Sequence, residues 1–209
     1  MTPPGDDPLD RVLAHVDLTR LAVALQKRPG LTIPPQGNER YAAIALVFRV
    51  GADGHPELLM IKRAEHEGDP WSGHVACPGG RVEPRDRDLE ETAIRETWEE
   101  TGIDLRTSGR MLGTLNDLAP RTPALPPLVI RPFVSIVSSD VRIVPSPEVA
   151  DAFWVPLAAL RERASWGLGL VEIRGIGPRE VDVFRHREHT IWGLTERVLR
   201  DLMDKLDAA

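Results

Sequence analysis

Residues 95–103 read Arg-Glu-Thr-Trp-Glu-Glu-Thr-Gly-Ile, and no other stretch constrains the structure of this chain as strongly. At about 100° per residue of an α-helix, Glu96, Glu99 and Glu100 fall within one arc of about 100°. Like charges at this spacing repel one another, and anions are disfavoured at the carboxyl end of a helix. A bound cation would relieve both effects, and carboxylate oxygens are the ligands that hard divalent ions prefer. The stretch therefore predicts a helix whose last turn carries a metal-binding face.

The ends of this helix are also marked in the sequence. Asp88 and Glu91 form an Asp-x-x-Glu capping pattern, and Gly102 is a natural carboxyl cap. The pattern predicts a helix over residues 89–101, with Trp98 among the apolar residues expected in the core.

A glycine pair precedes the helix and suggests the chemistry. Gly79 and Gly80 allow the backbone to approach a ligand closely, so that their carbonyls could join the carboxylates as metal ligands. Arg95 could neutralise and orient one glutamate through a bidentate pair, whereas Asp86 is expected to be solvated. Carboxylates, carbonyls and water describe a Mg²⁺ or Mn²⁺ site that is completed by substrate phosphates. The predicted reaction class is the metal-assisted hydrolysis of a phosphate ester or anhydride.

Composition limits the other possibilities. The 209 residues suit one domain with an appended segment, and the formal net charge of −6 argues against a nucleic-acid polymer as partner. No apolar run reaches the roughly 18 residues of a membrane span. The first residues lack the basic and apolar regions of a secretory signal. The one cysteine, Cys77, excludes an intrachain disulfide and is expected to be a small buried hydrophobe, so a cytoplasmic location is predicted.

Hydrophobic periodicity divides the chain at about residue 38. Residues 1–38 are interpreted as a helical extension whose helix, over residues 9–27, is interrupted at 17–19 with Asp17 as a cap. Residues 39–209 form the main domain, of fold class α/β (α+β), with a mixed sheet flanked by helices on both faces. Strands are expected at 41–50, 58–61, 111–115, 128–137 and 152–155. Residues 164–178 are interpreted as loop-like, with a strand candidate at 170–173, and a further candidate lies at 181–184. Further helices are expected at 156–163 and 194–206.

The glycine turn and the glutamate stretch together resemble a known signature. Gly80, followed by 14 residues and then by residues 95–103, resembles the Nudix box of the Nudix hydrolases. Asp86 stands where that box has a glutamate, and the spacing to Arg95 is one residue longer. Residues 78–88, continued by residues 92–96, resemble the longer, acidic lead-in of the coenzyme A pyrophosphatase branch. Other segments of the chain also resemble motifs of that branch: residues 59–64, 131–134 and 191–195. The resemblance implies a Nudix-type fold and the hydrolysis of nucleoside diphosphates linked to another group.

Roles for individual residues follow from this resemblance. It implies Glu96, Glu99 and Glu100 as ligands of Mg²⁺ or Mn²⁺. Arg95, Glu99, Glu100 and a later carboxylate, Glu148, are implied in catalysis, with the general base drawn from a box glutamate or from Glu148. The substrate-binding residues implied are Lys62, Arg63, Gly79, Gly80 and Arg81.

Three functions remain open at this point. The first is hydrolysis of coenzyme A or its acyl derivatives to 4′-phosphopantetheine and adenosine 3′,5′-bisphosphate. The second is a Nudix activity on nucleoside triphosphates, dinucleotides or ADP-ribose. The third is a nucleotide-binding module without catalysis, against which the three intact glutamates argue. The expected partner is a small nucleotide-diphosphate substrate, with no membrane and with a homodimer as one interpretation of the amino-terminal helix.

Overall fold

A mixed β-sheet forms the centre of the molecule. The computed structural model describes residues 7–34, 37, 39–66, 72–119, 127–173 and 177–208. Strand β1 (Arg40–Val50) runs parallel to β6 (Leu128–Val137) and antiparallel to both β2 (Pro56–Arg63) and β4 (Gly79–Arg81). The remaining strands of this sheet are β3 (Val75–Ala76), β5 (Gly109–Thr114) and β7 (Val149–Pro156).

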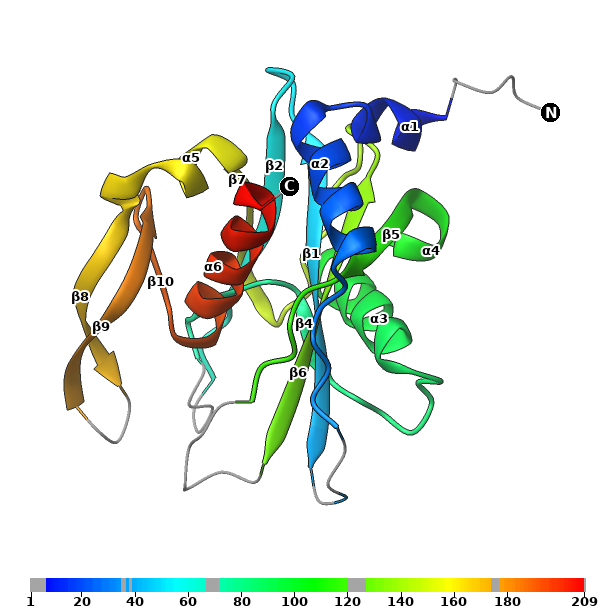
Figure 1. Ribbon diagram of the computed structural model, residues 1–209. Helices are drawn as coiled ribbons and strands as arrows, with labels where there is room; N and C mark the ends of the chain where they lie inside the picture. The colour runs from blue at the N-terminus through cyan, green and yellow to red at the C-terminus, as the bar shows by residue number, and fades with distance from the viewer. Residues whose placement is uncertain are drawn as a thin grey trace.

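Helices cover both faces of this sheet, as expected (Figure 1). Helix α3 (Leu89–Thr101) packs on one face, over the small side chains of Ala43 and Ala45. On the other face, α2 (Val16–Lys27) and α6 (Gly193–Asp207) pack against larger β1 residues such as Phe48. Because successive side chains of a strand alternate between faces, β1 supplies both cores. No helix in the described part of the chain is both long and apolar enough to cross a membrane.

The amino-terminal helices belong to the same core as the sheet. Helix α1 (Pro8–Leu13) ends at Ala14, and α2 begins directly after His15, whose Nδ1 accepts a hydrogen bond from the Asp17 backbone N–H. The expected break into two helices is confirmed, but its place at 17–19 and the cap at Asp17 are wrong, since the break falls at Ala14–His15 and His15 is the cap. Asp17 instead pairs with Arg161 at 2.8 Å, at the end of α5 (Leu157–Arg161).

A second, three-stranded antiparallel sheet lies in the carboxyl-terminal third and projects to one side of the molecule (Figure 1). It contains β8 (Trp166–Ile173), β9 (Gly177–His186) and β10 (His189–Trp192), and it follows the 3₁₀ turn η1 (Arg163–Ser165). The expectation that most of residues 164–178 form a loop is wrong. Gly169 lies within β8, paired with Val181 of β9, and a Cβ there would lie 2.7 Å from the Arg185 Nη2.

Candidate active site

Helix α3 has the predicted bounds, but its buried face differs from the expectation. Asp88 Oδ1 accepts from the Glu91 N–H at 2.8 Å, and Gly102 closes the helix with φ at 72°. Trp98 is 56% exposed, so its expected place in the core is wrong. The helix packs on the small alanines of β1 through Ala93, and the fully buried Thr97 hydroxyl donates to the Ala93 carbonyl at 2.7 Å. That bond satisfies a polar group in an otherwise apolar interface.

The expected turn at Gly79 and Gly80 is wrong, because both residues pair with β1 as part of strand β4. This glycine pair lies directly against two of the predicted ligands. The Gly79 N–H donates to Glu100 Oε2 at 2.9 Å. A Cβ at Gly80 would lie 2.3 Å from Glu96 Oε1, so only glycine leaves room for that carboxylate. The structure thus brings Glu96, Glu100, Gly79 and Gly80 together.

Burial makes these two carboxylates electrostatically unusual. Burial raises the pKa of Glu100 to about 8, with the charge of Glu96 adding to the effect and the Gly79 N–H opposing it. Burial also raises the pKa of Glu96, against the opposing effect of Arg95. A cation would favour the charged form of both carboxylates, and it would displace the proton that Glu100 holds at neutral pH.

Arg95 makes the bidentate pair that its residue type suggested, but with a different partner. Its Nε and Nη2 donate to the two carboxylate oxygens of Asp86, each at 2.9 Å. The side chain of Asp86 is 1% exposed, so the expectation that it is solvated is wrong. The guanidinium lowers the pKa of Asp86 well below its usual range. The sequence signal that could have identified this pair is the place of Asp86 in the motif, where a glutamate usually stands.

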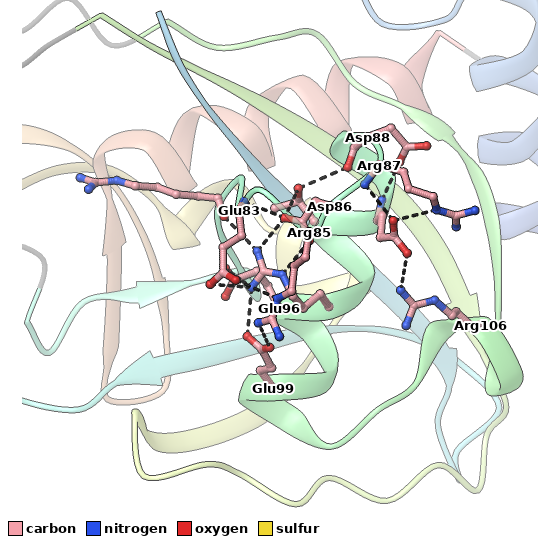
Figure 2. A network of polar contacts seen from close by, with 12 residues as sticks. Glu83, Arg85, Asp86, Arg87, Asp88, Glu96, Glu99 and Arg106 are labelled. Atoms are coloured by element: carbon pink, nitrogen blue, oxygen red, sulfur yellow. Dashed lines mark hydrogen bonds and ion pairs between the residues drawn. The ribbon is translucent and has the colours of Figure 1, made fainter.

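The third predicted ligand, Glu99, faces arginines. It accepts from Arg95 Nη1 at 3.0 Å and from Arg85 Nη2 at 2.8 Å, whereas Glu96 accepts from the same Arg95 atom at 2.8 Å. Figure 2 shows Glu83, Arg85, Glu96 and Glu99 gathered in this network. Arg95 therefore orients two glutamates at once, and Glu99 lies at the more exposed side of the cluster.

The three predicted phosphate-binding residues do not lie together. Arg63 Nη1 is 3.7 Å from Glu100 Oε1, on the α3 side of the sheet. Lys62 follows Met60 by two residues and so lies on the opposite face, where Met60 joins the core under α6. Arg81 pairs with Ala42, which faces the same way as Met60. Arg63 is thus the basic residue in contact with the glutamates, and Lys62 and Arg81 flank the glycine pair from the other side.

Glu148 lies close to the glutamate face although it is far away in the sequence. Its carbonyl accepts from the Ala64 N–H at 2.8 Å, which places it beside the end of β2 and next to Arg63. Its exposed carboxylate is near enough for its charge to raise the pKa of Glu100. Tertiary structure therefore brings this predicted residue to the same region as the helix.

The donor set fits a hard divalent cation in part. Two carboxylates repel each other beside the backbone of β4, whose close approach only glycine permits, and both would be stabilised by a cation. In the described ranges, however, no three His, Cys, Asp or Glu side chains are arranged to hold a metal ion. Glu96 and Glu100 form the part of a site that is in place, and Glu99 is turned toward Arg85 and Arg95.

Similarity to known proteins establishes the family of this chain. The family model for the NUDIX domain matches residues 39–171, which is more than half of the chain. The chain belongs to the NUDIX family, and it is a Nudix hydrolase acting on phosphorus-containing anhydrides. Hydrolases of this family generally use divalent metal ions.

Three relatives illustrate the range of the similarity. A Schizosaccharomyces pombe protein, C14C4.10c, is 39% identical over 110 residues, which span 50% of this chain but only 33% of that protein. The Nudix hydrolase NudL of Photorhabdus laumondii is 31% identical, with 84% of this chain and 92% of the relative covered. The mouse mitochondrial coenzyme A diphosphatase NUDT8 is 29% identical, with 99% and 91% covered.

A solved structure supports the fold. A MutT/nudix family protein from Enterococcus faecalis aligns over 100% of this chain and 76% of its own, with a TM-score of 0.57 and 14% sequence identity. At that identity the likeness concerns the architecture alone. The mixed sheet between helices is therefore the Nudix fold that the sequence led us to expect.

Proposed function

We propose that this hydrolase cleaves the diphosphate linkage of coenzyme A or its acyl derivatives, with Mg²⁺ or Mn²⁺ as cofactor. The observation that carries the proposal is the placement of the Glu96 and Glu100 carboxylates against Gly79 and Gly80 of strand β4. The full-length similarity to a mouse coenzyme A diphosphatase favours this substrate. The expected products are 4′-phosphopantetheine and adenosine 3′,5′-bisphosphate.

The proposed metal ligands are Glu96 and Glu100, with Glu99 as the third after it leaves its arginine partners. When bound, such an ion stabilises charge on the phosphoryl oxygens and lowers the pKa of a bound water. Arg95 holds Glu96 in place, and the fork to Asp86 fixes Arg95 in turn. This rigid support keeps the carboxylates in one arrangement before the substrate arrives.

The remaining residues would bind the phosphates and move a proton. Arg63, beside Glu100, is placed to hold a phosphate oxygen next to the glutamate face. Lys62 and Arg81 would contact the substrate on the opposite side of the glycine pair. Glu148 is the proposed general base, because it is exposed near Glu100, whereas Glu100 itself binds a proton at neutral pH unless a cation displaces it.

A substrate panel tests the proposal. Coenzyme A, NADH, ADP-ribose, dinucleoside polyphosphates and nucleoside triphosphates are each incubated with the protein and Mg²⁺ or Mn²⁺, and the products are separated by chromatography. We expect coenzyme A to be cleaved with the highest kcat/KM. If coenzyme A is inert while another compound turns over, the substrate is wrong and the family assignment stands. The expected homodimer and the expected cytoplasmic location stay predictions; the mouse relative is mitochondrial by name.

A further inference from the structure

A cavity of about 830 Å³ lies at the amino end of α3, away from the glutamate face. It is bounded by residues 32–34, by the starts of α3 and β1, and by β6, which runs beside β1 (Figure 1). Four arginines line it, against two aspartates: Arg40, Arg81, Arg87, Arg131, Asp86 and Asp88. Several of these charges belong to ion pairs: Arg131 pairs with Asp117, Arg87 with Glu91 and Asp86 with Arg95. A guanidinium that is held by a carboxylate at a concavity keeps N–H donors that an anion can accept from.

The buried carboxylate of Asp117 connects two parts of the cavity lining, Arg131 of β6 and the segment at Ile33. Asp117 accepts from Arg131 Nε and Nη2, each at 2.8 Å, and its Oδ2 also accepts from the Ile33 N–H at 2.9 Å. Its side chain is 1% exposed. Arg131 and the segment at Ile33 are therefore held in one arrangement, so a ligand would meet a largely preformed site.

A tyrosine hydroxyl beside Arg131 lacks a partner. The Tyr41 hydroxyl oxygen is buried, and in the described part of the chain it makes no hydrogen bond. It lies near enough to Arg131 for the two groups to interact electrostatically. A buried hydroxyl without a partner destabilises a protein, and an anionic oxygen seated at Arg131 is the acceptor that this hydroxyl lacks.

The other walls are apolar. Ile33, Pro34, Val82 and Leu89 line the cavity together with the ring of Tyr41. A bare inorganic anion would leave these surfaces without contact, whereas a nucleotide offers both a phosphate and a planar base. We propose that this cavity binds the phosphate monoester end of a nucleotide, at a place separate from the glutamates that carry the proposed chemistry.

The position of the cavity leaves two sources for that phosphate. Leu89 lines the cavity, and the rise from Leu89 to Glu96 along α3 is about 10 Å. A substrate cleaved at Glu96 could therefore reach the cavity with a second phosphate, such as the 3′-phosphate of coenzyme A. The alternative source is a separate nucleotide, whose binding would act on Asp86 and, through it, on Arg95.

The binding test uses adenosine 3′,5′-bisphosphate as the probe, in calorimetric titrations with chelator so that no metal contributes. The Arg40→Gln/Arg87→Gln double variant removes two exposed cations, and Val82→Trp fills the cavity from a position that is 40% exposed. The matched controls are Arg179→Gln and Val23→Trp, whose parent valine is 41% exposed on α2. Arg131 is left intact, because its loss would leave Asp117 buried without its partner.

We expect the wild type to bind the probe, and each cavity variant to bind it about tenfold more weakly, since charge-assisted bonds or space are lost. The controls should bind as the wild type does. A wild type that gives no binding signal at millimolar probe would overturn the proposal, and so would cavity variants whose affinity equals that of the controls. Glu100→Gln should bind the probe normally, which separates this test from that of the proposed function.

A kinetic comparison identifies the source. Coenzyme A and dephospho-coenzyme A differ by the 3′-phosphate alone. If the cavity receives the substrate's own phosphate, the wild type has a lower KM for coenzyme A than for dephospho-coenzyme A. The double variant then loses this difference in KM, with little change in kcat. If the preference survives while the probe's affinity is lost, the cavity serves a separate nucleotide. Either result supports a phosphate site, provided that the titration has shown one.

Discussion

At the scale of single residues, the site depends on charges placed where water is scarce. Glu100 is buried beside a second glutamate and Arg63, and Asp86 is buried beneath Arg95. The two carboxylates respond in opposite ways: the pKa of Glu100 is raised, and that of Asp86 is lowered. Glu100 therefore needs a cation to be charged at neutral pH, whereas Asp86 already has one in Arg95.

Asp86→Asn should destabilise the protein by about 2–3 kcal/mol, since the charge-assisted fork to a buried guanidinium is lost. Urea denaturation at pH 7 measures this. Asp204→Asn, an exposed change on α6, should stay within about 0.5 kcal/mol of the wild type. Equal stability of the two variants would mean that the Asp86–Arg95 pair does not support the site.

The metal-free protein should lose stability as pH rises through the range set by Glu100. Its pKa is 4.5 as the ordinary value and about 8 when folded. Between these values the folded state holds a proton that the unfolded state has released, so the free energy of unfolding falls with rising pH. Glu100→Gln cannot ionise and should show a shallower slope over the same window. Thermal unfolding in the presence of chelator, repeated across this pH range, measures both proteins. If their stabilities fall with pH at the same slope, the pKa of Glu100 is not raised.

At the scale of elements, strand β4 brings two glycines to the helix, and each has a different reason to be glycine. A Cβ on Gly79 would lie 2.4 Å from the backbone oxygen of Ala43, at a φ of 155°. A Cβ on Gly80 would meet the flexible end of the Glu96 side chain instead. Moving the backbone of Ala43 would cost much free energy, whereas the Glu96 carboxylate can move at a small cost.

Gly79→Ala should therefore destabilise the fold by about 2 kcal/mol or more, through backbone strain. The free energy of unfolding of Gly80→Ala should stay within about 1 kcal/mol of that of the wild type. Its kcat should fall at least about tenfold, because Glu96 is displaced. Denaturation curves and steady-state kinetics on both variants measure the contrast. Full activity in Gly80→Ala would show that the position of Glu96 does not matter.

The elements also show what could be read from the sequence. Helix α3 was predicted to the residue, because Asp88 and Gly102 are local signals. Most of strand β8 was not predicted, because glycines are typical of loops. Its pairing with β9, where the Arg185 side chain lies close to Gly169, depends on residues that follow later in the chain. The two-residue strand β3 is too short to carry a periodic signal. Helix ends could be predicted from residues close in the sequence, whereas the pairing of distant strands could not.

The same division holds for the site. The glutamates, the glycine pair and Arg95 are close in sequence, so their proximity followed from helix geometry. Whether Lys62 or Arg63 faces the glutamates depends on which face of β2 meets α3, which only the assembled sheet reveals. The partner of Arg95 likewise depends on how the loop before α3 folds back, which brings Asp86 under the guanidinium.

At the scale of the whole molecule, the core extends beyond the residues that match the family. The family match covers residues 39–171, yet Leu21 of α2 is fully buried in the cluster that includes Phe48 of β1 and Leu202 of α6. Both ends of the chain thus cover one face of the sheet (Figure 1). We expect the described elements to unfold as one cooperative unit.

Leu21→Ala should lower the free energy of unfolding by about 2–5 kcal/mol, the cost of a cavity in a close-packed core. Val23→Ala, at a 41% exposed position of the same helix, should cost far less. Circular dichroism and tryptophan fluorescence should report coincident transitions for both variants. A separate early transition for Leu21→Ala would show that the amino-terminal helices are an independent attachment.

The α3 carboxylates are proposed to carry the hydrolysis of a diphosphate. The rate of coenzyme A cleavage with Mg²⁺ tests this in the wild type and in Glu100→Gln, with Glu90→Gln as the control on the exposed side of the same helix. We predict that the wild type and the control release 4′-phosphopantetheine and adenosine 3′,5′-bisphosphate, and that Glu100→Gln is slower by about a hundredfold or more. Cleavage by Glu100→Gln at the wild-type rate would contradict the claim.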